Sequence, residues 1–180
     1  MSKIIGIDLG TTFSAIAQLD DLGNPEVLAS TDTNKKITAS AVYLKEKNAV
    51  VGDKALDALI ATPKNVATET KRQMENDVVF STQKGEWIDK EGAKEDCYSP
   101  AQVSSFILGK LKGYTSDVKK AVITVPALFA EKARVATLDA AKMAGIEVIE
   151  LINEPTAAAC YYASLTAVKK ITGKVLVFDL

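Results

Sequence analysis

The second half of the chain alternates between apolar strands and helices, and this alternation constrains the fold more than any other feature. Strands are predicted at residues 119–125, 147–152 and 174–180, with one helix before the first strand and helices between the others. Strands that are joined through helices pair in parallel, by right-handed crossovers. The chain is therefore predicted to have an α/β fold.

Local signals mark the helix ends. Ser99 is predicted to cap a helix whose first residue is Pro100. Pro126 is predicted to open the second helix and Gly145 to end it, and a third helix, rich in small residues, is predicted to begin at residues 153–155. The predicted buried stripe of the second helix comprises Phe129, Ala133, Ala136, Ala140, Met143 and Ala144.

The N-terminal half has a different pattern. Residues 4–30 are predicted to form a meander of three strands, at 4–9, 13–19 and 26–29. The polar block that follows has predicted short strands at 41–44 and 49–51, helices at 53–61 and 66–74, and a hairpin formed by 78–80 and 86–88. We therefore expect a core subdomain of residues 1–30 and 99–180, with residues 31–98 inserted as a small α+β subdomain.

Composition excludes several kinds of chemistry. Lys and Arg number 22 and Asp and Glu number 23, so no excess of positive charge indicates a nucleic-acid surface. The chain contains no histidine, which excludes Ser-His-Asp triads, Cys-His dyads and histidine-ligated metals. Any reaction must use carboxylates, lysines, hydroxyls and backbone amides. No stretch has the length and flanks of a signal peptide or a membrane span, so a cytoplasmic location is expected.

A turn rich in polar groups joins the first two predicted strands. It contains one carboxylate, Asp8, one glycine, Gly10, and two hydroxyls, Thr11 and Thr12. A ligand can approach the backbone closely at Gly10, because this residue has no side chain. The turn suits a metal-bound polyphosphate, although an ordinary hairpin turn explains the same residues equally well. The chain has neither a P-loop nor a dinucleotide-binding fingerprint.

Three carboxylates, those of Asp8, Glu154 and Asp179, are predicted to lie at the carboxyl ends of strands, where ligands bind in such sheets. Each of them alone also suits a turn or a helix start. Together they would repel one another unless a cation lay between them, and hydrated magnesium is expected because it prefers oxygen ligands. Lys71 is a fourth candidate, although a lysine on an exposed helix is usually only a solvated charge.

Several short motifs occur together along the chain. They are residues 7–12 with Ser14, then residues 52–53, 70–72, 121–127, 152–159 and 177–180. In combination they resemble the seventy-kilodalton heat-shock chaperones of the DnaK type, in which the first and last of these stretches belong to phosphate motifs. The first motif alone is also similar to those of sugar kinases and structural, actin-like ATPases, which are the alternative interpretation.

The resemblance implies an actin-like (ribonuclease H-like) ATPase lobe, with a mixed sheet flanked by helices and the small inserted subdomain. The chain would be the N-terminal part of the ATPase domain, with its last strand at the crossing to a second lobe. The parent protein would hydrolyse ATP, with magnesium, to control the binding of unfolded peptides by a C-terminal domain. The implied partners are client peptides, a J-domain co-chaperone and a nucleotide-exchange factor, with no nucleic acid and no membrane. The chain alone is expected to be inactive.

The resemblance also implies roles for individual residues. Lys71 would position the γ-phosphate or the attacking water, and Glu154 would help to order that water. Asp8 and Asp179 would hold magnesium through its waters. The phosphates would be contacted by Gly10, Thr11, Thr12 and Phe13, and the nucleotide state would be coupled to peptide binding by Pro126 and Arg134.

Three positions depart from the family's usual pattern. Ala39 stands where the family has proline, and Leu128 and Ala130 replace the usual aromatic residue and asparagine beside Phe129. None of these changes removes a candidate catalytic group. They indicate a divergent member of the family, in which the allosteric details differ.

Overall fold

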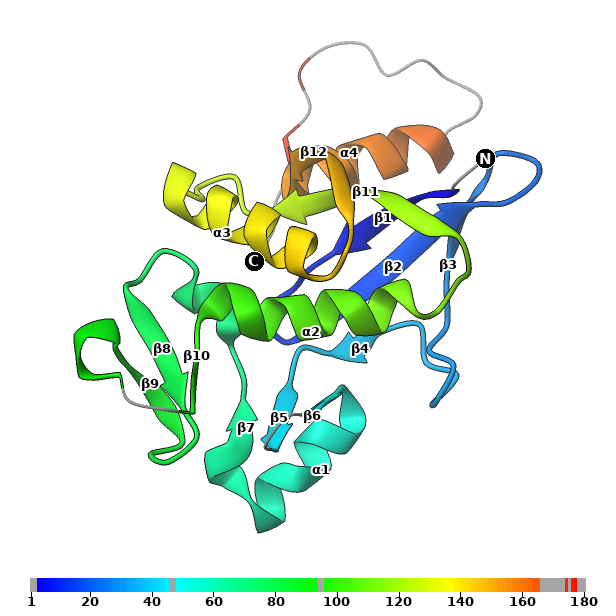
Figure 1. Cartoon of the computed structure of the whole chain (residues 1–180). Coiled ribbons are helices and arrows are strands. Elements are labelled where there is room, and N and C mark those ends of the chain that lie inside the picture. The colour runs from blue at the N-terminus through cyan, green and yellow to red at the C-terminus, as the bar shows by residue number, and fades with distance from the viewer. Residues whose placement is uncertain (1–2, 46–47, 94–95, 166–173, 175, 178–180) are drawn as a thin grey trace.

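A computed structural model describes residues 3–45, 48–93, 96–165, 174, 176 and 177 of the chain (Figure 1). The largest sheet has the strand order β12–β11–β1–β2–β3, and a short strand, β4, pairs with β2. These strands are β1 (Lys3–Asp8), β2 (Phe13–Leu19), β3 (Pro25–Val27), β4 (Thr38–Ala39), β11 (Val118–Val125) and β12 (Glu147–Asn153). The predicted strand at 174–180 lies mostly outside the described residues, so its expected place in the fold stays a prediction.

The largest sheet is mixed. Strand β11 pairs in parallel with β12, as the strand–helix alternation predicted, and β1 pairs in parallel with β11. Strands β1, β2 and β3 pair antiparallel, so the predicted meander is confirmed, with its third strand beginning at Pro25. In this register Asp8 lies beside Thr124 of β11. The carboxyl end of β1 is therefore next to the carboxyl end of β11.

Three helices accompany this sheet: α2 (Pro100–Lys112), α3 (Glu131–Met143) and α4 (Glu154–Leu165). Helix α2 begins with the predicted cap, because Ser99 Oγ accepts from the amide of Gln102 at 3.2 Å. The side-chain oxygen of Gln102 accepts in return from the amide of Ser99 at 2.8 Å, which completes a capping box. None of these described helices is both long and apolar enough to cross a membrane.

The predicted start of α3 at Pro126 is wrong, since the helix begins at Glu131. Residues 126–129 form a turn instead, in which the amide of Phe129 donates to the carbonyl of Pro126 at 3.1 Å. Arg134, from the first turns of α3, binds the Phe129 carbonyl, and Glu75, from a distant segment, binds the Ala130 amide. These contacts hold the backbone before Glu131, so Pro126 does not open a helix although proline suits a first helical position. Gly145, at a φ of 66°, follows the helix end as predicted.

The buried face of α3 differs in part from the predicted stripe. Ala133 and Ala140 are fully buried, as expected, and Thr137 and Ala141 are buried with them. Met143 is 53% exposed, because it lies at the flank of the helix face that contacts the sheet. Phe129, Ala136 and Ala144 are partly buried and pack against the core, so only Met143 of the predicted stripe lies outside it.

One hydrophobic core joins the sheet and the helices. It contains Ile5 and Ile7 of β1, Ile123 of β11, and Ile107 and Leu111 of α2, all of them almost inaccessible to water. Since side chains alternate along a strand, Gly6 and Asp8 face the opposite side of β1. This opposite side is the one that carries the candidate site.

Residues 42–98 add two small antiparallel sheets, with the strand orders β6–β5–β7 and β10–β8–β9. Their elements are β5 (Val42–Lys45), β6 (Asn48–Val51), α1 (Asp53–Ala61), β7 (Val66–Ala67), β8 (Val78–Ser81), β9 (Glu86–Asp89) and β10 (Cys97–Tyr98). Helix α2 lies between these sheets and the largest sheet (Figure 1) and contacts both sides. Because Val42 and Phe80 belong to the same core as Ile5, the division into two subdomains stays a prediction.

The predicted helix at 66–74 is wrong. Val66 pairs with Tyr43 of β5, so the segment begins as a strand. Glu69 then adopts a left-handed backbone with a φ of 52°, which interrupts any helix, and a single turn of 3₁₀ helix follows, η2 (Thr70–Gln73). Tertiary pairing outweighs local helix propensity here. Lys71 is thus on a tight turn rather than on an exposed helix.

The cap of α2 gives a direct test of the fold. Replacing Ser99 by alanine removes the acceptor for the Gln102 amide, so the free energy of unfolding should fall by about 1 kcal/mol in urea titration. Ser105→Ala is the matched control, because the Ser105 hydroxyl donates to the carbonyl of Gln102, which is already part of the helix. Equal stability of the two variants would contradict the assigned cap.

Candidate functional site

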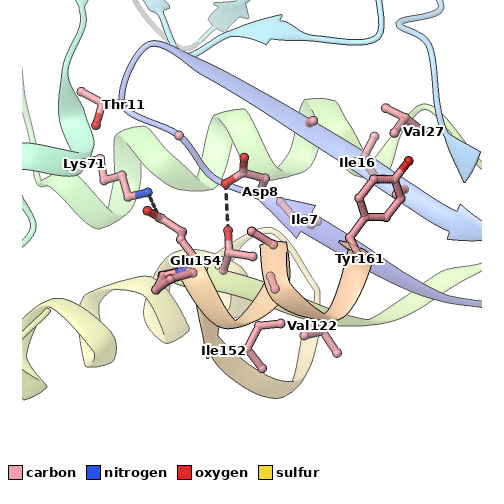
Figure 2. A pocket seen from close by; sticks show the side chains of 18 of the residues that line it. Ile7, Asp8, Thr11, Ile16, Val27, Lys71, Val122, Ile152, Glu154 and Tyr161 are labelled. Carbon is pink, nitrogen blue, oxygen red and sulfur yellow. Dashed lines mark hydrogen bonds and ion pairs between the residues drawn. The ribbon is translucent and has the colours of Figure 1, made fainter. Parts of the chain in front are cut away.

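A pocket of about 680 Å³ lies at the carboxyl ends of β1 and β11 and beside the start of α4 (Figure 2). The sheet contributes small and apolar side chains to its floor, among them Ala15, Ala17 and Val122, and α4 contributes Ala157 and Tyr161. In Figure 2 the charged groups gather at the end away from Tyr161. The pocket therefore combines a broad apolar surface with one polar end, which is the usual composition of a small-molecule site.

An ion pair between Lys71 and Glu154 forms this polar end. Lys71 comes from η2 and Glu154 is the first residue of α4, so two segments 83 residues apart meet here. The side chain of Lys71 is only 10% exposed and that of Glu154 23% exposed. A lysine this deeply placed needs a charged partner, so Lys71 is not a solvated surface charge.

Asp8 lies at the end of β1 with its carboxylate turned toward the pocket (Figure 2). Thr124 Oγ1 donates a hydrogen bond to Asp8 Oδ1 at 2.8 Å. The two residues are neighbours in the parallel register of β1 and β11, which explains why they meet. Thr124 thereby fixes the direction of the carboxylate, while among the described residues the other oxygen of Asp8 stays available to a ligand.

The turn after β1 is held by two buried serines. The amide of Gly10 donates to Ser14 Oγ at 3.2 Å, and Ser40 Oγ donates to the Gly10 carbonyl at 2.8 Å. The two hydroxyl oxygens are also 2.8 Å apart. A Cβ atom on Gly10 would lie 2.0 Å from the Phe13 carbonyl oxygen, so only glycine fits this turn. Its shape is set before any ligand binds.

The remaining predicted site residues are spread over several places. Gly10 and Thr11 line the pocket, whereas Thr12 and Phe13 are exposed and do not line it. Asp179 lies outside the described residues. Pro126 and Arg134 do not line the pocket. Arg134 Nη2 nevertheless donates to Asn153 Oδ1 at 2.8 Å, and Asn153 is the residue directly before Glu154.

Reasoning from the sequence missed three residues that support the site: Thr124, Ser40 and Glu75. Thr124 left one usable signal, since it is a hydroxyl residue at the carboxyl end of a strand predicted to run beside others in parallel. No sequence signal marked Ser40 or Glu75. Ser40 binds a backbone group 30 residues away, and Glu75 binds one 55 residues away. Contacts of this kind depend on tertiary structure and produce no periodic pattern.

The donor groups fit a hydrated magnesium ion. Asp8, Thr11 and the backbone of the turn offer oxygen ligands, which magnesium prefers, and an ion that keeps most of its waters needs few protein ligands. The carboxylate of Glu154 is already paired with Lys71. In the part of the chain that the structure describes, no three acidic or cysteine side chains converge on one point.

Comparison with known protein families gives a match. The family model described as "Hsp70 protein" matches residues 4–180, which is nearly the whole chain. The chain therefore belongs to the Hsp70 family, whose members are ATP-binding chaperones with ATPase activity. The mixed sheet with helices and two small antiparallel sheets is consistent with the actin-like lobe of that family.

Two glycines of the same stretch test the geometry of the turn. Gly10→Ala should lower the free energy of unfolding by about 2 kcal/mol or more, because the new methyl group overlaps the Phe13 carbonyl. Gly6→Ala is the matched control: a Cβ there meets nothing within 4 Å, and stability should stay the same or rise slightly. Urea titration of both variants measures the difference, and an equally stable Gly10→Ala protein would contradict the described turn.

Proposed function

We propose that this chain forms the first lobe of an ATP-hydrolysing unit and that its pocket receives the phosphates of ATP. The observation that carries the proposal is the Lys71–Glu154 ion pair, largely removed from water, in the pocket that also contains Asp8 and Gly10. A cation, a carboxylate at a strand end and a glycine turn are the groups that a polyphosphate with magnesium requires. Membership of the Hsp70 family supports the same function.

In this proposal the turn between β1 and β2 contacts the phosphates. The missing side chain of Gly10 allows a phosphate to approach, and Thr11, Thr12 and Phe13 offer backbone amides and hydroxyls. Ser14 and Ser40 hold the Gly10 peptide groups in place, so little reorganisation is needed on binding. Preorganised donors of this kind favour developing charge on a transferred phosphoryl group.

Lys71 and Glu154 would act on the reacting end of the nucleotide. The transfer of a phosphoryl group to water needs positioning and charge neutralisation rather than a covalent nucleophile. The Lys71 ammonium would neutralise charge on the γ-phosphate or orient the attacking water. Glu154 both holds that ammonium and offers an oxygen that accepts a hydrogen bond from the water.

Asp8 and Asp179 would hold magnesium through its water ligands, as the family resemblance suggests. Thr124 supports this role for Asp8, because it fixes one carboxylate oxygen and leaves the other free. When bound, magnesium neutralises phosphate charge. The role of Asp179 rests on its sequence motif alone.

The parent protein would use ATP hydrolysis to control the binding of unfolded peptides by a C-terminal domain. A J-domain co-chaperone and a nucleotide-exchange factor are the corresponding partners, in the cytoplasm. Pro126 and Arg134 would carry the nucleotide state toward that domain. The hydrogen bond from Arg134 to Asn153 supports this role, because Asn153 directly precedes Glu154.

Nucleotide binding by the chain alone should be weak. The described pocket is built by a single lobe and is lined on its open side by exposed side chains such as Tyr161. Isothermal titration of ATP and magnesium into the 180-residue chain should therefore give a Kd well above the micromolar range, and no hydrolysis. Micromolar or tighter binding of ATP would contradict the proposal that the site needs a second lobe.

In the ATP-hydrolysing parent, Lys71→Ala should lower kcat by about 100-fold or more, since the charge nearest to the reacting phosphate is lost. The fold should be retained, as circular dichroism would show. Arg72→Ala is the control variant, because this neighbouring cation forms an exposed ion pair with Glu69 at the surface and its loss should leave turnover unchanged. Unchanged turnover in Lys71→Ala would contradict the assigned role.

A further inference from the structure

Helix α3 receives part of its cap from a distant segment. Ala130, the residue at its N-cap, has no side-chain acceptor, and the third helical residue, Ala133, cannot reach back as Gln102 does in α2. The amide of Ala130 donates instead to Glu75 Oε1 at 3.0 Å, across 55 residues of sequence. Glu75 thus supplies to α3 the acceptor that its own sequence lacks.

The contacts of Glu75 lead back to the ion pair. Arg134 Nε donates to the carbonyl of Phe129, the residue before Ala130, at 3.2 Å. The same guanidinium donates through Nη2 to Asn153 Oδ1 at 2.8 Å, and the next residue, Glu154, binds Lys71. Glu75 itself follows Lys71 by four residues. These contacts form a closed ring through four segments: residues 71–75, 129–130, 134 and 153–154.

The segment that carries Lys71 depends on such outside support. It begins with a left-handed residue, Glu69, and η2 itself has only four residues. The hydroxyl of Thr70 is buried without a hydrogen-bond partner among the described residues. Backbone strain and an unpaired buried hydroxyl are maintained only when surrounding contacts fix the conformation. Buried Met74 and the Glu75 contact are the supports at the far end of this turn.

We propose that Glu75 is a positioning residue for the Lys71–Glu154 pair. Its carboxylate ties the turn that carries Lys71 to the start of α3, and Arg134 ties the same place to the residue before Glu154. The segments that carry Lys71 and Glu154 are thereby both held against the start of α3, at residues 129–134. Glu75 does not line the pocket, so it acts through Lys71 and not on the nucleotide. The structural role of Glu75 does not depend on the proposed function, whereas its effect on catalysis rests on the proposed ATP hydrolysis.

The test uses nuclear magnetic resonance of the 180-residue chain without nucleotide, so it is independent of whether the parent hydrolyses ATP. The readouts are the exchange rate of the Ala130 amide hydrogen and the side-chain nitrogen resonances of Lys71 Nζ and Arg134 Nε. In Glu75→Ala, the exchange of Ala130 should rise about fivefold or more, the factor expected for the loss of one capping hydrogen bond. Both side-chain resonances should shift, because the ring is opened.

Two further variants separate positioning from local capping. Glu75→Gln keeps an acceptor oxygen and should restore most of the Ala130 protection and both resonances. Asp77→Ala removes a neighbouring carboxylate that contacts the first turn of α3 through Lys132 at 2.8 Å but is not part of the ring, so Lys71 and Arg134 should be unaffected. The proposal is overturned if Ala130 exchange does not change in Glu75→Ala, or if Lys71 Nζ stays at its wild-type position while Ala130 exchange rises.

Discussion

The ion pair between Lys71 and Glu154 is the interaction on which the candidate site depends. It links the short turn after β7 to the start of α4, two segments that share no backbone pairing. Removing a lysine from water costs free energy, and pairing with a carboxylate offsets part of that cost. A single charge left unpaired in this place would be unfavourable, so each partner restricts where the other can lie. The pair thus fixes one end of the pocket before any ligand enters.

Around this pair the fold supplies three supports with different physical origins. Backbone register places Thr124 beside Asp8, so the carboxylate at the end of β1 has a defined direction. Buried hydroxyls hold both peptide groups of Gly10. The capping contact from Glu75 to Ala130 fixes the turn that carries Lys71. The contacts made by Thr124, Ser40 and Glu75 join segments that are far apart in the sequence, so the site can form only when the largest sheet and residues 42–98 pack together.

Much of the fold could be predicted from the sequence, because strong local signals agree with the tertiary structure. The strand–helix alternation predicted the parallel pairing of β11 with β12, and Ser99 with Pro100 marked the start of α2. The errors arose where tertiary contacts outweigh local preference. Val66 joins a sheet through a partner 23 positions earlier, Tyr43, and the backbone at Ala130, after Pro126, is held by Glu75 from a distant segment. No local pattern reports either contact.

For the site, residue types and family motifs singled out groups that the structure places in one pocket, namely Asp8, Gly10, Thr11, Lys71 and Glu154. The supporting residues Ser40 and Glu75 could not be predicted, because one hydrogen bond between distant segments leaves no spacing rule in the sequence. The most direct test of a phosphate site here is a titration of the chain with ATP and magnesium, followed by amide chemical shifts. The largest changes should occur at residues 10–13 and at Lys71. Changes confined to other surfaces, with none at this turn, would contradict the assignment of the pocket.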